Sequence, residues 1–91
     1  MEIVLNRKFG SFSISDFAKE KLGIDTNRPY DMRTDERFID LIKEYGSSQV
    51  SGRFANLQIF EMPENTTDYI VNEYDGFEIL IYVVDGKICD F

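Results

Sequence analysis

Two segments of the chain repeat apolar residues with the period of an α-helix. The first stripe consists of Ile14, Phe17, Ala18 and Leu22, and the second of Phe38, Leu41, Ile42 and Tyr45. Ser15 is positioned as the N-cap of the first helix, and Thr34 or Asp35 as that of the second, while a glycine follows each segment. We therefore expect two amphipathic helices, separated by a surface loop over residues 24–33.

Five other segments have the composition of β-strands, one before the helices and four after them. They are Glu2–Asn6, Leu57–Met62, Asp68–Tyr74, Phe77–Val84 and Lys87–Phe91. An Asp-Gly pair separates each of the last three, and this pair favours the type I′ hairpin turn, which needs a positive φ at both central residues. The order β-α-α-β-β-β-β predicts an α+β fold in which two helices pack on one face of a mainly antiparallel sheet, with the last four strands as a meander.

The composition narrows the classes of protein to which the chain can belong. Its 91 residues fit one small acidic domain, residues 1–91, with a single core. There is no His, and the one Cys can form neither an internal disulfide nor a thiolate cage. We therefore expect no metal, no cofactor, no catalytic residue and a cytoplasmic location. The longest apolar stretch, Ile79–Val84, is too short for a membrane helix, so we expect no membrane contact and no signal peptide.

The acidic excess is confined to one part of the chain. Residues 1–53 carry nine basic and nine acidic side chains, whereas residues 54–91 carry eight acidic and one basic, which accounts for the net charge of −7. Such a charge repels nucleic-acid phosphates and attracts basic surfaces, so we expect a protein partner and no direct binding of nucleic acid. The alternative is a solvated face that keeps a small protein soluble. The candidate partner-binding residues are Asp68, Glu73, Tyr74, Asp75 and Glu78.

A second candidate site lies where a strand leads through a Gly/Ser loop into a capped helix, because such a loop can present backbone N–H groups to an anion. The loop lacks the spacing of a phosphate-binding P-loop. Two arginines near the second helix can supply countercharge. The alternative is an ordinary tight turn whose aromatic residues fill the core. The candidate anion- or ligand-binding residues are Asn6, Gly10, Ser11, Arg33 and Arg37.

Several motifs follow one another in an informative order. A strand ending in Asn leads into an aromatic-Gly-x-Phe-x-Ile-Ser loop over residues 5–15, and a capped helix spans Arg33 to Gly46. Leu57–Pro63 and the sequence Glu-Tyr-Asp-Gly-x-Glu at 73–78 come next. In this order the motifs resemble a family of small phage and prophage proteins of uncharacterised function, although Lys8 stands where that family often has Cys. The resemblance implies an accessory role in a bacterial host cell.

These features favour a non-enzymatic accessory protein that binds a basic surface of a host protein through its acidic C-terminal sheet, as an inhibitor or a nucleic-acid mimic. One alternative is a sponge for a nucleotide-like small molecule that counters host defence signalling, with phosphates held by the Asn6–Ser15 loop. Another is a structural or assembly protein that forms a homo-oligomer through an exposed hairpin edge.

Overall fold

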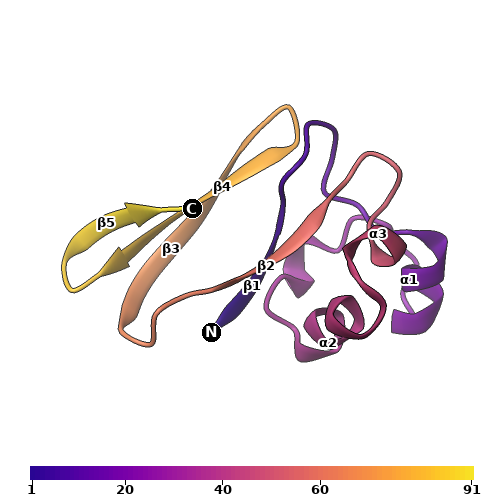
Figure 1. The fold of residues 1–91 in the computed structure, drawn as a ribbon, viewed down its shortest axis with the longest axis horizontal. Coiled ribbons are helices and arrows are strands. Elements are labelled where there is room, and N and C mark those ends of the chain that lie inside the picture. The colour runs from indigo at the N-terminus through magenta and orange to yellow at the C-terminus, as the bar shows by residue number, and fades with distance from the viewer.

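The computed structural model describes residues 1–91 and has the element order expected from the sequence (Figure 1). Three α-helices and a short 3-10 helix lie between the first strand and the other four. The elements are β1 (Glu2–Asn6), α1 (Asp16–Leu22), the 3-10 helix (Tyr30–Met32), α2 (Glu36–Tyr45), α3 (Ser47–Val50), β2 (Leu57–Glu61), β3 (Thr66–Tyr74), β4 (Phe77–Val84) and β5 (Lys87–Asp90). The α+β class is confirmed.

The two longer helices begin at the caps that the sequence indicates. The Ser15 hydroxyl accepts a hydrogen bond from the backbone N–H of Ala18 at 3.1 Å. Asp35, rather than Thr34, caps α2 by accepting from the backbone N–H of Arg37 at 2.8 Å. A glycine follows each of these helices. None of the helices is long and apolar enough to cross a membrane.

The strands form two antiparallel sheets rather than one. β2 pairs with β1, and β3, β4 and β5 form a separate three-stranded meander. The expectation that Leu57–Met62 opens a four-stranded meander is therefore wrong. β1 requires a hydrogen-bonding partner along its length, and β2 supplies one while burying Leu57 against the helices. Both Asp-Gly turns are confirmed, because all four of their residues have positive φ.

β1 lies at the centre of the molecule and is buried on both faces. Val4 packs with Phe38 and other residues of the helical side, whereas Ile3 and Leu5 pack on the opposite side with Leu80 of β4. The molecule therefore has three layers, in the order helices, β1–β2 sheet and β3–β5 sheet (Figure 1). No element of the chain covers the side of the β3–β5 sheet that faces away from β1.

Candidate functional site

Asn6, at the end of β1, is fully buried and joins three segments of the chain. Its backbone N–H donates to Glu78 Oε1 at 2.7 Å, and its side-chain Nδ2 donates to the carbonyl oxygens of Gly76 and Lys8 at 2.6 and 2.9 Å. Its Oδ1 accepts from the backbone N–H of Asn56 at 2.8 Å. Both side-chain donors are therefore used within the chain, and none remains for an anion.

Arg33 and Glu78 form an ion pair beside Asn6. Two hydrogen bonds, of 2.7 and 2.5 Å, join the guanidinium to the two carboxylate oxygens, and the side chains are only 14% and 3% exposed. The guanidinium also donates to the Val4 carbonyl oxygen at 3.0 Å and lies 4.3 Å from the centre of the Phe12 ring. This bidentate pair connects the helical layer to β4 across β1.

The interior position of these groups corrects three of the predicted roles. Glu78 is not part of an exposed acidic surface, because it is 2% exposed and both of its carboxylate oxygens are engaged. Asn6 and Arg33 are not free to bind an anion, because the chain itself occupies their donors. All three residues hold the layers of the fold together.

Arg37 lies on the surface and is also paired. Its guanidinium meets the carboxylate of Asp35 at 3.2 Å, next to the helix cap. The side-chain hydrogen bond from Arg37, followed by the bond from its backbone N–H, lowers the pKa of Asp35 from its usual value. The same hydrogen bond raises the pKa of Arg37. The predicted countercharge from Arg37 is therefore directed to the start of α2.

Gly10 packs against the β3–β4 turn rather than opening toward a ligand. Its N–H donates to the Asp75 carbonyl oxygen at 2.6 Å. A Cβ on Gly76 would lie 2.1 Å from the Gly10 carbonyl oxygen, so this contact requires glycine. The Glu73 carboxylate accepts from the Gly76 N–H at 2.6 Å and so stabilises the turn.

Four of the predicted partner-binding residues, Asp68, Glu73, Tyr74 and Asp75, remain exposed but do not form one cluster. Tyr74 is 74% exposed and meets the ring of Phe9 edge-on, next to Asp75 in the turn. Asp68 pairs with Val83 near the other end of the hairpin. At about 3.3 Å per residue, Asp68 and Asp75 are roughly 20 Å apart along the strand.

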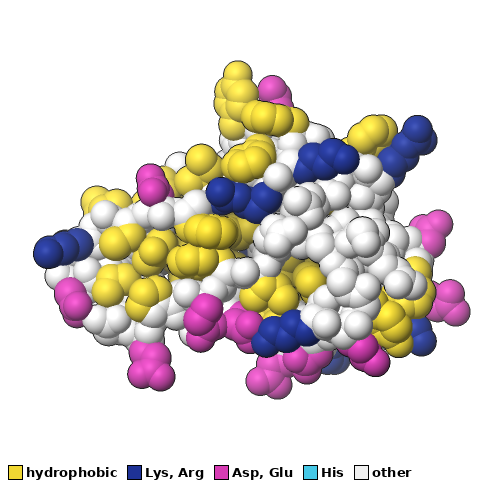
Figure 2. Space-filling model, in the orientation of Figure 1, with side chains coloured by type: hydrophobic (Ala, Val, Ile, Leu, Met, Phe, Trp, Pro, Cys, Tyr) yellow, Lys and Arg dark blue, Asp and Glu magenta, His cyan; other side chains and the backbone are white.

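The outer face of the β3–β5 sheet, which is the face turned away from β1, is apolar. Leu80 points toward β1, so strand alternation directs the side chains on either side of it outward. Ile70 and Ile88 are 55% and 78% exposed. Figure 2 shows hydrophobic side chains gathered over this end of the molecule. The aliphatic residues of this outer aliphatic face are Ile70, Ile79, Ile81, Val83 and Ile88.

Carboxylates border the outer aliphatic face. Asp68 pairs with Val83 and Asp90 with Ile81, so both aspartates lie on the same face as the isoleucines. None of the acidic side chains that follow Met62 on the exposed surface takes part in an ion pair. These are Glu64, Asp68, Glu73, Asp75, Asp85 and Asp90. The sheet thus combines an apolar centre with an acidic margin.

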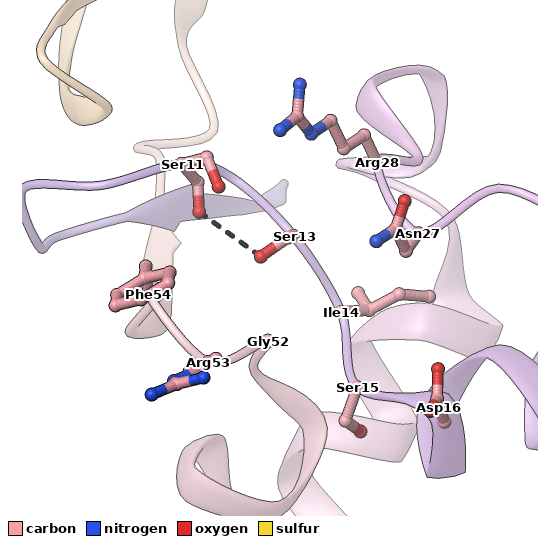
Figure 3. Close-up of a pocket in the computed structure, with 10 residues that line it drawn as sticks. All are labelled: Ser11, Ser13, Ile14, Ser15, Asp16, Asn27, Arg28, Gly52, Arg53 and Phe54. Carbon is pink, nitrogen blue, oxygen red and sulfur yellow. Dashed lines mark hydrogen bonds between the residues drawn. The ribbon is translucent and has the colours of Figure 1, made fainter.

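A polar pocket of about 360 Å³ lies on the helical side of the molecule (Figure 3). Residues 11–16, 27–28 and 52–54 line it. Arg28 and Arg53 stand on opposite sides of the pocket, and neither guanidinium has a hydrogen bond or ion pair within the chain. Of the predicted anion-binding residues, only Ser11 lines this pocket.

Two groups of surface residues were not predicted. The outer aliphatic face did have a signal in the sequence, because Ile79–Val84 is apolar at both odd and even positions and such a strand is apolar on both faces. Arg28 and Arg53 had none. They lie in separate loops, and only the fold brings them to one pocket.

The acidic residues do not gather into a cation site, since no group of three Cys, Asp or Glu side chains is placed to hold a metal ion. No protein-family model, curated protein or solved structure matches the chain.

Proposed function

We propose that this is a non-enzymatic binding protein that uses the outer aliphatic face and its acidic margin to cover a basic surface of another protein. The observation that carries the proposal is the set of five aliphatic side chains left without a covering layer and bordered by unpaired carboxylates. Exposed apolar patches with a polar border are typical of protein interaction sites. The apolar centre excludes water, and the charged margin favours one class of partner.

The negative charges of the acidic margin indicate which class of partner protein binds this surface. A second copy of the chain would bring Asp68 and Asp90 against carboxylates of the same sign, which disfavours self-association at low salt. A partner with an apolar centre surrounded by lysines and arginines complements both parts of the surface. The apolar centre also favours occlusion of such a surface over mimicry of nucleic acid, because a mimic needs carboxylates across the whole face.

The resemblance to small phage and prophage proteins supports a bacterial host protein as this partner. Clustered lysines and arginines on one face are typical of proteins that bind nucleic acid. Covering such a face would keep nucleic acid away from it, which is the action of an inhibitor.

The proposal is tested by affinity capture from a bacterial lysate at low and at moderate salt, with four versions of the chain as bait. These are the natural protein, the face variant Ile70→Thr/Ile88→Thr, the margin variant Asp68→Lys/Asp90→Lys and the control Glu20→Lys/Asp25→Lys. The control makes the same change of charge at exposed residues of the helical side.

We expect a basic protein that binds the natural and control baits, is lost from the face and margin variants, and binds more weakly at moderate salt because exposed charges are screened. Capture that is indifferent to salt and to both variants contradicts the proposal. Sedimentation of the natural protein distinguishes a foreign partner from a second copy of the chain. A dimer that is broken by Ile70→Thr/Ile88→Thr would show that a second copy covers this face.

A further inference from the structure

We infer that the polar pocket between Arg28 and Arg53 binds a small organic phosphate that carries a planar ring, a ligand of the nucleotide type. This site lies among α1, the loops at residues 27–28 and 52–54 and the loop that follows β1, and none of its lining residues belongs to β3, β4 or β5. It is independent of the proposed protein-binding surface and goes beyond that function.

The guanidinium groups of two arginines at this pocket are free to bind an anion. Arg33 pairs with Glu78 and Arg37 with Asp35, whereas the guanidinium groups of Arg28 and Arg53 have no hydrogen bond or ion pair within the chain. Arg53 lies over the ring of Phe54, 5.2 Å from its centre. They flank the pocket from opposite sides (Figure 3). A guanidinium presents a planar fork of N–H donors that matches the oxygens of a phosphate.

Uncharged polar groups lie between the arginines. The Ser11 hydroxyl and the Asn27 side chain have no hydrogen-bond partner within the chain, and the Ser13 hydroxyl donates only a long bond of 3.4 Å to the Ser11 carbonyl oxygen. Figure 3 shows the Ser11 and Ser13 hydroxyls on the same side of their loop. These side chains can complete the hydrogen bonding of phosphate oxygens between the two guanidinium groups.

The pocket is formed before any ligand enters, because backbone hydrogen bonds join its walls. The Gly52 N–H donates to the Ser13 carbonyl oxygen at 2.9 Å, and the Ile14 N–H to that of Asn27 at 2.8 Å. A Cβ on Gly52 would lie 2.2 Å from Ser13 Oγ, so the two segments touch. Preformed walls lower the entropy lost when a ligand binds.

The other residues that line the pocket indicate the ring and the charge of the ligand. Phe54 is 57% exposed at the pocket, and an exposed aromatic ring is a surface on which a planar base can stack. Asp16 is the only acidic residue of the lining, so the pocket has a net positive charge. A second hollow of about 530 Å³ shares Gly52 and Arg53 and is lined by Lys8, which gives room and charge for a further phosphate.

Titration of the full chain with four probes tests this inference by isothermal calorimetry at low salt. The probes are adenosine 5′-monophosphate, ribose 5-phosphate, adenosine and inorganic phosphate. We expect saturable binding of the monophosphate, binding of ribose 5-phosphate that is about tenfold weaker for lack of the stacked ring, and no measurable binding of adenosine. Weak binding of inorganic phosphate alone would overturn the assignment to a ring-bearing ligand.

Variants then locate the site. Arg28→Ala and Arg53→Ala should each weaken the monophosphate about tenfold, because each removes charge-assisted hydrogen bonds, whereas Asp16→Asn should strengthen it severalfold. Arg37→Ala is the matched control, since this exposed arginine lies outside the pocket. Both pocket arginines are exposed, and a thermal melt of each variant verifies that it remains folded. The absence of monophosphate binding at millimolar concentration, or an equal loss in Arg37→Ala, would refute the inference.

Discussion

At the scale of single residues, polar side chains that suggested binding chemistry instead hold the interior together. Arg33 and Glu78 can remain buried because the pair is bidentate and the Asn6 N–H satisfies the carboxylate further. The sequence placed Asn6 at the end of a strand, Arg33 near the start of a helix and Glu78 in a hairpin. It did not predict that the three residues meet. That contact crosses the three layers of the fold, so no local pattern reports it.

Removing one partner of this pair should therefore cost much of the stability of a small domain. We expect Glu78→Ala to lower the free energy of unfolding by about 3–5 kcal/mol, because Arg33 is left buried without a countercharge and Asn6 loses an acceptor. Urea denaturation measures the change. Glu73→Ala, on the opposite strand, is the control and should cost far less because Glu73 is exposed. Equal losses in the two variants would refute a structural role for the ion pair.

The Asp35 cap should make the stability of α2 depend on pH. Because the pKa of Asp35 is lowered in the folded chain, its charge stabilises the fold above the unfolded pKa of an aspartate. This contribution is lost as the pH falls through the folded pKa. The difference in melting temperature between the natural protein and Asp35→Ala should therefore shrink on acidification. Asp35→Asn is the control, because asparagine caps a helix without a charge. We expect the difference in melting temperature between Asp35→Asn and Asp35→Ala to stay constant with pH.

At the scale of elements, the sequence predicted what is local. The two longer helices, α1 and α2, follow from apolar periodicity and their caps, and the hairpins from the Asp-Gly turns. The division of the strands into two sheets was not predictable in this way, because the pairing of Leu57–Glu61 with Glu2–Asn6 joins segments at opposite ends of the helical region. Strand composition alone does not select between the two possible neighbours of β2.

The two Asp-Gly turns provide a matched pair for the contact between the Gly10 loop and β3–β4. Gly76 and Gly86 have similar positive φ values, 87° and 75°, but only Gly76 has close neighbours. Gly86→Ala should cost about 1–2 kcal/mol for the left-handed backbone alone. Gly76→Ala should cost more, because its Cβ would clash with the Gly10 carbonyl oxygen. Chemical denaturation of both variants measures the difference, and equal costs would contradict the close packing described here.

At the scale of the whole molecule, the sequence correctly assigned the acidic excess to the C-terminal part of the chain. It did not predict the exposed apolar surface in the same part. Asp68 and Asp90 border the outer aliphatic face, and one of the predicted acidic residues, Glu78, lies inside the fold. The helical layer and the β3–β5 sheet lie on opposite sides of β1, so they present two separate surfaces (Figure 1). A partner that binds the sheet therefore need not contact the polar pocket.

A titration of the methyl-labelled protein with the basic protein retained in the capture experiment, followed by NMR, tests directly whether the outer aliphatic face is the binding surface. The isoleucines report on both sides of the molecule, since Ile70, Ile81 and Ile88 lie on the outer aliphatic face and Ile39 and Ile42 lie in the helical core. We predict that the partner shifts the methyl signals of Ile70, Ile81 and Ile88 and leaves those of Ile39 and Ile42 unchanged. Shifts confined to the helical isoleucines, with the outer face unaffected, would show that the partner binds elsewhere on the molecule and would contradict the proposed function.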